Sequence, residues 1–195
     1  MVITYGTRDS LRPETYVNTT SQSKEAWSKQ LSPFLLGPVR LYGIMKAKSV
    51  ENGWQFAKVY AQHTDQDGDP TGAYWKWATE GWQNPRGVRY PMGKGAAPEY
   101  HYWDGEKLDY ITARKRIYIP LYTRAVWHTE AFQMLKAQAE IRDDLYLWDF
   151  DSYEYRRQGM TWEDAVNNPE RPLGHAMVLA MLLENPQHLK DVIQR

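Results

Sequence analysis

The spacing of apolar residues along the chain predicts four helices. Residues 50–62 place Val50, Trp54 and Ala57 on one helical face, and Ser49 before them is a suitable N-cap. The segment 174–183 is apolar nearly all round, which predicts a helix at the centre of the protein. The complete set of predicted helices is 50–62, 72–82, 129–142 and 174–183.

Short runs rich in β-branched and aromatic residues predict strands between these helices. They lie at residues 39–42, 116–122 and 145–150. Pro120 places the second run at an edge or at the end of a strand, because proline cannot donate to a strand ladder. Helices and strands together predict an α+β fold, a single compact domain that is mainly helical with a small sheet.

The polarity of the chain changes at two places and suggests its organisation. Residues 1–30 are polar with few apolar anchors, so we expect an arm or irregular cover before a domain that spans residues 31–195. Within that domain, residues 63–110 form a long insertion rich in aromatic side chains. Its acidic segment 65–70 resembles a calcium loop but lacks the glutamate at the twelfth position, and we interpret it as a solvated turn.

Composition limits the ligands that the protein can bind. The 195 residues include 24 basic and 24 acidic side chains, so no overall charge attracts nucleic acid. Cysteine is absent, which excludes disulfides and thiolate chemistry. There is neither a long apolar run nor a signal-peptide core, so we expect a cytoplasmic protein, or one in the host cytoplasm for a virus, without a membrane partner. The 9 Trp and 14 Tyr suit a cleft that stacks a base or sugar, although an irregular aromatic core explains many of them.

Glu51, Gln55 and Lys58 form the main candidate for chemistry. Their i, i+4, i+7 spacing puts an acid, an amide and an amine on one stripe of the predicted helix, whose dipole favours an ionised Glu51. Asp149 and Asp151 end a predicted strand, where acids either point into a cleft or cap the next segment. For both sets the alternatives of catalysis and of a solvated or capping role are open.

Basic residues offer contacts for phosphate. Lys94 lies between two glycines without the spacing of a P-loop, which leaves a looser site of exposed amides with Arg89 and Lys94. The run from Arg114 to Arg116 either holds a phosphate or flanks an exposed strand. The histidines show no metal-ligand spacing and no Gly-x-Ser-x-Gly motif occurs, so we expect neither a metal nor a cofactor. The histidines are residues 63, 101, 128, 175 and 188.

Several segments together resemble the NADAR family of N-glycosidases, which hydrolyse bonds between ribose C1′ and a nitrogen. Residues 31–34 are similar to a Ser-Asn-Phe-like element of that family, and residues 50–58 to its Glu-His-x-x-Gln-x-x-Lys block. Asn52 stands where the family has histidine, and Pro33 where it has asparagine. Weaker similarity extends over residues 113–122, 145–152 and 173–177.

The resemblance implies roles for the candidate residues. Breaking the C1′–N bond builds positive charge on the ribose, which Glu51 would stabilise, or it would accept a proton from a ribose hydroxyl. Lys58 would attack the opened sugar as a Schiff-base nucleophile, and Asp149 or Asp151 would supply a second acid–base group. The expected substrate contacts are Ser32, Phe34, Gln55, Trp75, Arg89, Lys94 and Arg114.

The resemblance implies one of two substrates, ADP-ribose attached to guanine in DNA or a ribose-phosphate amine of riboflavin biosynthesis. The aromatic insertion suits an additional base or strand and favours removal of ADP-ribose from a modified nucleobase. The expected partners are therefore an ADP-ribose-type or nucleotide substrate and ADP-ribosylated DNA, with the oligomeric state open. Alternatives are a non-catalytic module that binds a nucleotide or ADP-ribose derivative as a sensor or sponge, and an interaction protein that docks a partner through residues 74–82.

Overall fold

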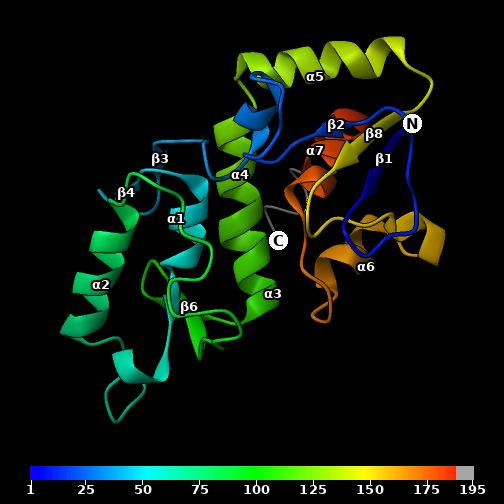
Figure 1. Ribbon diagram of the computed structural model, residues 1–195. Coiled ribbons are helices and arrows are strands. Elements are labelled where there is room, and N and C mark those ends of the chain that lie inside the picture. Colours follow the sequence, from blue (N-terminus) through cyan, green and yellow to red (C-terminus); the bar gives the residue numbers. More distant parts are fainter. Residues whose placement is uncertain (188–195) are drawn as a thin grey trace. The chain divides into compact units, whose positions relative to one another are not determined.

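The computed structural model describes residues 1–187, which divide into two compact units. The first unit joins Met1–Ser32 to the chain from Tyr122 onward, and the second is the continuous segment Pro33–Leu121. Separate helices and small sheets occur in both, as Figure 1 shows, which confirms the α+β class. His188 lies outside the described residues.

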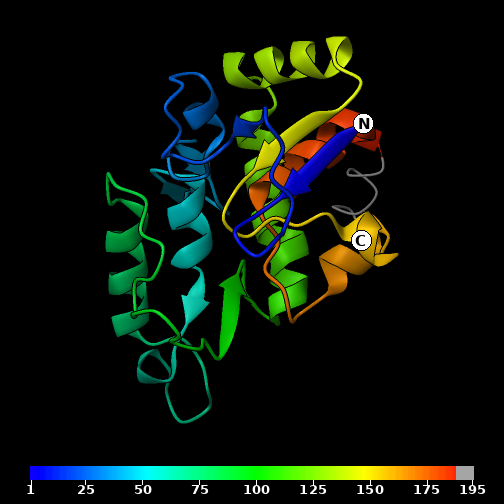
Figure 2. The same ribbon diagram turned by 45° about the vertical axis from the view of Figure 1, so that its right-hand side comes forward.

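A three-stranded parallel sheet forms the centre of the first unit. Strand β8 (Leu145–Trp148) lies between β1 (Val2–Tyr5) and β2 (Val17–Asn18) and pairs with both in parallel. Helix α7 (His175–Glu184) packs along β1 and β8, beside the sheet in Figure 2. Its side chains from His175 to Leu182 are all buried, which confirms the predicted central helix.

Shorter helices complete the first unit. Thr129 caps α5 by accepting a hydrogen bond from the amide of Phe132. Thr161 caps α6 by accepting a hydrogen bond from the amide of Asp164. The Asp164 carboxylate in turn accepts a hydrogen bond from the amide of Thr161. These helices are η1 (Ser28–Leu31), α5 (Glu130–Ile141), η4 (Tyr155–Gln158) and α6 (Trp162–Asn167).

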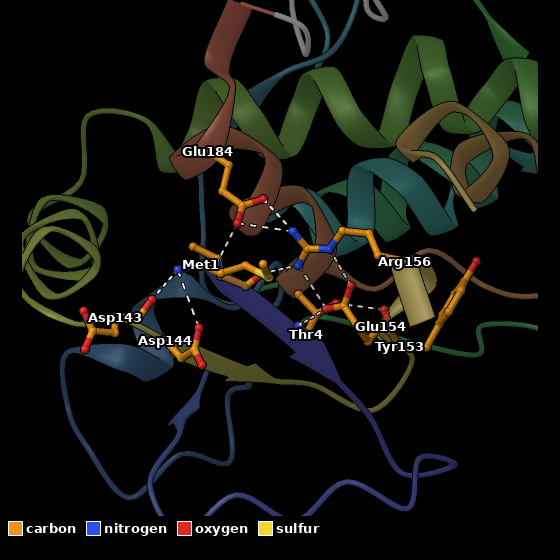
Figure 3. A network of polar contacts seen from close by, with 9 residues as sticks. Met1, Thr4, Asp143, Asp144, Tyr153, Glu154, Arg156 and Glu184 are labelled. Atoms are coloured by element: carbon orange, nitrogen blue, oxygen red, sulfur yellow. Dashed lines mark hydrogen bonds and ion pairs between the residues drawn. The ribbon is translucent and has the colours of Figure 1, made fainter. Parts of the chain in front are cut away.

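A polar network closes the outer edge of β1, as Figure 3 shows. Glu184 accepts the amide of Val2 at 2.7 Å, and Glu154 accepts that of Thr4 at 3.1 Å. Arg156 donates to the carbonyl of Val2 and forms ion pairs of 2.6 Å with Glu154 and 3.0 Å with Glu184. Side chains thus form hydrogen bonds with backbone amides and a carbonyl of this edge strand. Without these bonds the same groups would be available to pair with another strand.

The second unit contains an antiparallel sheet, a hairpin and helices. Strand β6 (Tyr100–Trp103) lies between β5 (Lys58–Val59) and β7 (Glu106–Leu108), and β3 (Val39–Arg40) pairs with β4 (Lys46–Ala47). Its helices are α1 (Val50–Gln55), η2 (Ala61–His63), α2 (Gly72–Trp82), α3 (Tyr110–Ala113) and the π-helical η3 (Arg114–Tyr118). Helix α4 (Ile119–Val126) follows η3 directly, and the boundary between the units falls within it.

Two aromatic residues of α2, Tyr74 and Trp82, pack into the core of the second unit. A Cβ atom on Gly81 would lie 2.0 Å from the ring of Phe56, so glycine permits the close approach of α2 to the segment after α1. The Tyr74 hydroxyl donates to the carbonyl of Phe56 at 3.2 Å. Tyr74 and Trp82 are buried, so the two are not available to dock a partner.

Two elements differ from the sequence prediction in the second unit. We predicted a strand at residues 116–122, but this segment lies in η3 and α4. Its residues from Ile117 to Tyr122 are all buried, and periodicity cannot separate a strand from a helix when every side is covered. Pro120 is the second residue of α4, directly after the π-helical η3. The helix predicted at residues 50–62 ends at Gln55 instead.

The start of the chain also differs from the prediction. We expected residues 1–30 to form an arm or irregular cover, but Val2–Tyr5 is a buried strand that pairs with β8. The sequence signal was weak because all four side chains of this short strand are buried and no polar alternation marks it.

Candidate functional site

Helix α1 presents the main candidate residues, and its start is firmly held. The Ser49 hydroxyl accepts a hydrogen bond from the amide of Asn52 at 3.2 Å. The amides of Val50 and Glu51 donate to the carbonyls of Leu36 and Pro33, each at 2.9 Å. The segment before β3 therefore satisfies the first turn of α1 and fixes the backbone that carries Glu51.

Glu51, Gln55 and Lys58 form one hydrogen-bonded chain. Gln55 Nε2 donates to Glu51 Oε1 at 2.9 Å, and Lys58 Nζ donates to Gln55 Oε1 at 2.7 Å. Glu51 and Gln55 are only 6% and 7% exposed. The structure thus brings the three predicted residues together in a buried setting, although Lys58 lies on β5 and not on the helix.

The environment of Lys58 makes its amine easier to deprotonate than that of an exposed lysine. Burial lowers the pKa of Lys58 to about 8, and the smaller opposing effect comes from the Glu51 carboxylate. The Lys58 Nζ atom lies 5.6 Å from the centre of the Trp54 ring. Lys58 therefore combines a position beside an acid with a titration range close to neutral pH, as a nucleophilic amine requires.

His101 and Trp54 lie beside Lys58, although the sequence did not indicate either as a functional residue. His101 is aligned with Lys58 in the β5–β6 ladder, and its ring stacks on Trp54 with a centroid distance of 4.5 Å. Burial, and then the charge of Lys58, lower the pKa of His101 to about 3, so the imidazole is neutral. No sequence signal connects residues so far apart, because the link is a strand pairing.

Asn52 fastens a loop to α1. Its side chain is fully buried, and its Nδ2 donates to the carbonyls of Asn84 at 2.9 Å and Arg86 at 3.1 Å. Its Oδ1 accepts the amide of Val88 at 2.9 Å. A Cβ atom on Gly87 would lie 2.7 Å from the Phe34 ring, so the loop also packs tightly on Phe34. Asparagine is a poor helix former, so its presence within α1 was the sequence feature that could have indicated hydrogen bonds from its side chain to the backbone of another segment.

An Asn52→Ala variant is expected to lose about 2–4 kcal/mol of unfolding free energy, because it leaves one amide and two carbonyls without their partner. Denaturant unfolding measures the loss. Asn84→Ala is the matched control, since the Asn84 side chain accepts only the amide of Arg86 among the bonds of this loop. Equal costs for the two variants would contradict the role of Asn52.

Asp149, in the first unit, acts as the acceptor for several elements. Its Oδ1 accepts the amides of Asp151 at 2.8 Å and Ser152 at 2.6 Å, and its Oδ2 accepts that of Ala176 at 2.8 Å. The same Oδ2 pairs with His175 Nδ1 at 3.1 Å. The carboxylate is 2% exposed and joins the end of β8 to the start of α7, which supports the capping interpretation.

The neighbours of Asp149 extend this connection. His175 Nε2 lies 2.9 Å from both the carbonyl oxygen and the hydroxyl of Thr19, directly after β2. A Cβ atom on Gly174 would lie 2.5 Å from Asp149 Oδ1, so only glycine fits beside the carboxylate. Asp151 is half-buried at the same turn. This cluster holds β2, β8 and α7 in register.

The remaining predicted residues occupy different settings. Ser32 is buried at the end of the first segment of the first unit, whereas Trp75 on α2 is half-buried and packs edge-on against Tyr102 at 5.2 Å. The Arg89 guanidinium lies 5.3 Å from the Tyr90 ring, and Lys94 is exposed. Arg114 is 1% exposed within η3, and its guanidinium lies 4.6 Å from the Tyr110 ring. The run at 114–116 belongs to the π-helical η3, and Arg116 pairs with Glu106 of β7 at 2.7 Å.

The protein is thus of the α+β class, and its second unit holds a candidate site. In this site the buried Glu51 carboxylate of a short helix is joined through the Gln55 amide to the desolvated Lys58 amine. The chain belongs to the family described as "Family of unknown function (DUF6939)", which matches residues 8–179. No curated protein matches the chain. Within residues 1–187, none of the helices has the length and apolar character needed to cross a membrane.

Proposed function

We propose that the protein is an N-glycosidase that hydrolyses a ribose C1′–N bond, and specifically one that removes ADP-ribose from modified guanine in DNA. The observation that carries the proposal is the buried chain Glu51–Gln55–Lys58, with a pKa of about 8 for its amine. The resemblance of residues 50–58 to the NADAR block supports the choice of reaction. The specific choice of ADP-ribose rests on the aromatic insertion and on that resemblance.

The chemistry needs an acid and an amine in these roles. When the ribose ring is opened, Lys58 Nζ forms a bond to C1′, the C1′–N bond to the base breaks, and the base leaves with a proton from the amine. Water then adds to C1′ and releases the free sugar, which restores Lys58. Ring opening breaks the C1′–O4′ bond and places a proton from water on O4′, and the Glu51 carboxylate stabilises the positive charge that develops at C1′.

The two aspartates receive different weight in this proposal. The Asp149 oxygens already accept three amides and the His175 contact, so we assign Asp149 to holding α7 and not to proton transfer. Asp151 is half-buried at the same turn of the first unit, and we assign it no role in the reaction. Arg89 and Lys94 are proposed phosphate contacts, on a segment whose beginning Asn52 fixes to the helix of Glu51.

The direct test is incubation with a DNA oligonucleotide that carries ADP-ribosylated guanine, with chromatographic measurement of free ADP-ribose. We expect release by the unchanged protein and loss of release in Glu51→Gln. A ribose-phosphate amine, tested in parallel, distinguishes the riboflavin-type substrate. No release of sugar from either substrate would contradict the proposed reaction.

One observation favours a second candidate, a non-catalytic module that binds a nucleotide or ADP-ribose derivative. Asn52 takes the place of the histidine in the NADAR block, and both ends of its amide hold the loop 84–88. It therefore supplies no acid or base. Recovery of intact ADP-ribosylated oligonucleotide after tight binding would support this candidate over the enzyme.

A further inference from the structure

The Gln55 amide lies between Glu51 and Lys58 and contacts both. The carboxylate of Glu51 can only accept at the contact with Nε2, and the amine of Lys58 donates to Oε1, so both partners define the orientation of the amide. Gln55 is 7% exposed, and the two contacts of 2.9 and 2.7 Å leave it little freedom to turn. The side chain therefore has a fixed direction, with its donor toward the acid and its acceptor toward the amine.

Titratable groups from α1 and β6 lie beside Lys58. Glu51 on α1 is the carboxylate that acts on it, and His101 on β6 is neutral because burial and Lys58 lower its pKa to about 3. Asp109, at the start of α3, acts on His101. The uncharged ring of Trp54 also lies beside Lys58, with its centre 5.6 Å from Nζ. The charge of the side chain at position 55, which touches Nζ directly, must therefore have a strong effect on Lys58.

We propose that Gln55 is a positioning residue that sets how readily Lys58 gives up its proton, because it accepts from Nζ and holds the Glu51 carboxylate one amide away. A carboxylate at position 55 would pair directly with the buried ammonium and stabilise it. An apolar side chain would remove the acceptor for the ammonium proton and destabilise the charged form. The inference rests on the proposed function only in assigning the Lys58 amine the role of a nucleophile.

The test measures the reactivity of Lys58 without any glycosidase substrate. The full chain is methylated with formaldehyde and cyanoborohydride at a series of pH values, and mass spectrometry of the digest follows the Lys58 peptide. The peptide of Lys94, which is exposed, serves as the internal reference. In the unchanged protein the midpoint is expected near pH 8, the pKa that burial gives Lys58.

The variants are expected to shift this midpoint in opposite directions. Gln55→Glu raises it by at least about 1 pH unit, which slows methylation of Lys58 near neutral pH about tenfold. Gln55→Met lowers it. Glu51→Gln also lowers it, because the Glu51 carboxylate raises the pKa of Lys58, and this variant retains the neutral Gln55 side chain.

Opposite shifts support the proposal, since a merely structural role would change the stability of the variants without separating their midpoints. Equal midpoints in all folded variants, or shifts of Gln55→Glu and Gln55→Met in the same direction, would overturn it. If Gln55→Glu does not fold, the pair Gln55→Met and Glu51→Gln decides, and an unchanged midpoint in both overturns the proposal. A shifted midpoint without release of ADP-ribose would leave Gln55 in this role and contradict only the proposed reaction.

Discussion

A Lys58→Met variant is expected to release ADP-ribose from modified DNA at a rate lower by a factor on the order of 10³ or more, because no other group replaces a nucleophile that forms the covalent intermediate. Methionine is similar in length to lysine, so it fills the half-buried position but lacks the amine. Initial rates at saturating substrate measure the effect. The rate of the unchanged protein should rise with pH up to about 8, because the uncharged form of Lys58 increases as pH approaches its lowered pKa.

The matched control is Lys107→Met in the same unit. Lys107 is exposed on β7 and pairs with Asp69 at 2.7 Å, so its loss changes surface charge without touching the Glu51–Gln55–Lys58 chain. We expect the Lys107→Met rate to remain within about a factor of two of the unchanged protein, in line with the small effect of exposed ion pairs. A Lys58→Met rate close to that of Lys107→Met would exclude Lys58 as the nucleophile.

The site was predictable to the extent that its residues are close in sequence. Glu51 and Gln55 are one helical turn apart, and the predicted contact between them exists. Lys58 reaches Gln55 for a different reason than the one we gave, because the helix ends and the chain turns at Phe56 before β5 begins. The pairing of β5 with β6 decides this, and that pairing depends on residues about 40 positions away.

The unpredicted parts of the site are contacts between distant segments. Asn52 holds residues 84–88, and His101 stacks on Trp54, yet neither contact leaves a local pattern in the sequence. The α+β class was predictable because apolar spacing shows helices such as α5, and the length of the apolar run shows α7. The segment 116–122 was not, because its burial on all sides removes the periodicity that separates helix from strand.

An Asp149→Ala variant is expected to lose about 3–5 kcal/mol of unfolding free energy, because it leaves several buried donors without an acceptor and each such donor costs about 1–3 kcal/mol. The change leaves His175 Nδ1 and the amides of Asp151, Ser152 and Ala176 without their acceptor in the interior of the first unit. These groups belong to β8, the turn after it and α7, so the loss weakens the centre of that unit. Urea unfolding followed by tryptophan fluorescence measures it.

Two further variants separate the hydrogen bonds of Asp149 from its shape and from general charge effects. Asp149→Asn keeps the shape of the side chain but places an NH₂ group where one carboxylate oxygen accepts hydrogen bonds. The loss of unfolding free energy should therefore be nearly as large as in Asp149→Ala. Asp144→Ala should cost less than about 1 kcal/mol, because Asp144 is exposed and pairs at 3.7 Å with the terminal amine of Met1. A stable Asp149→Asn protein would show that the carboxylate is not what joins β8 to α7.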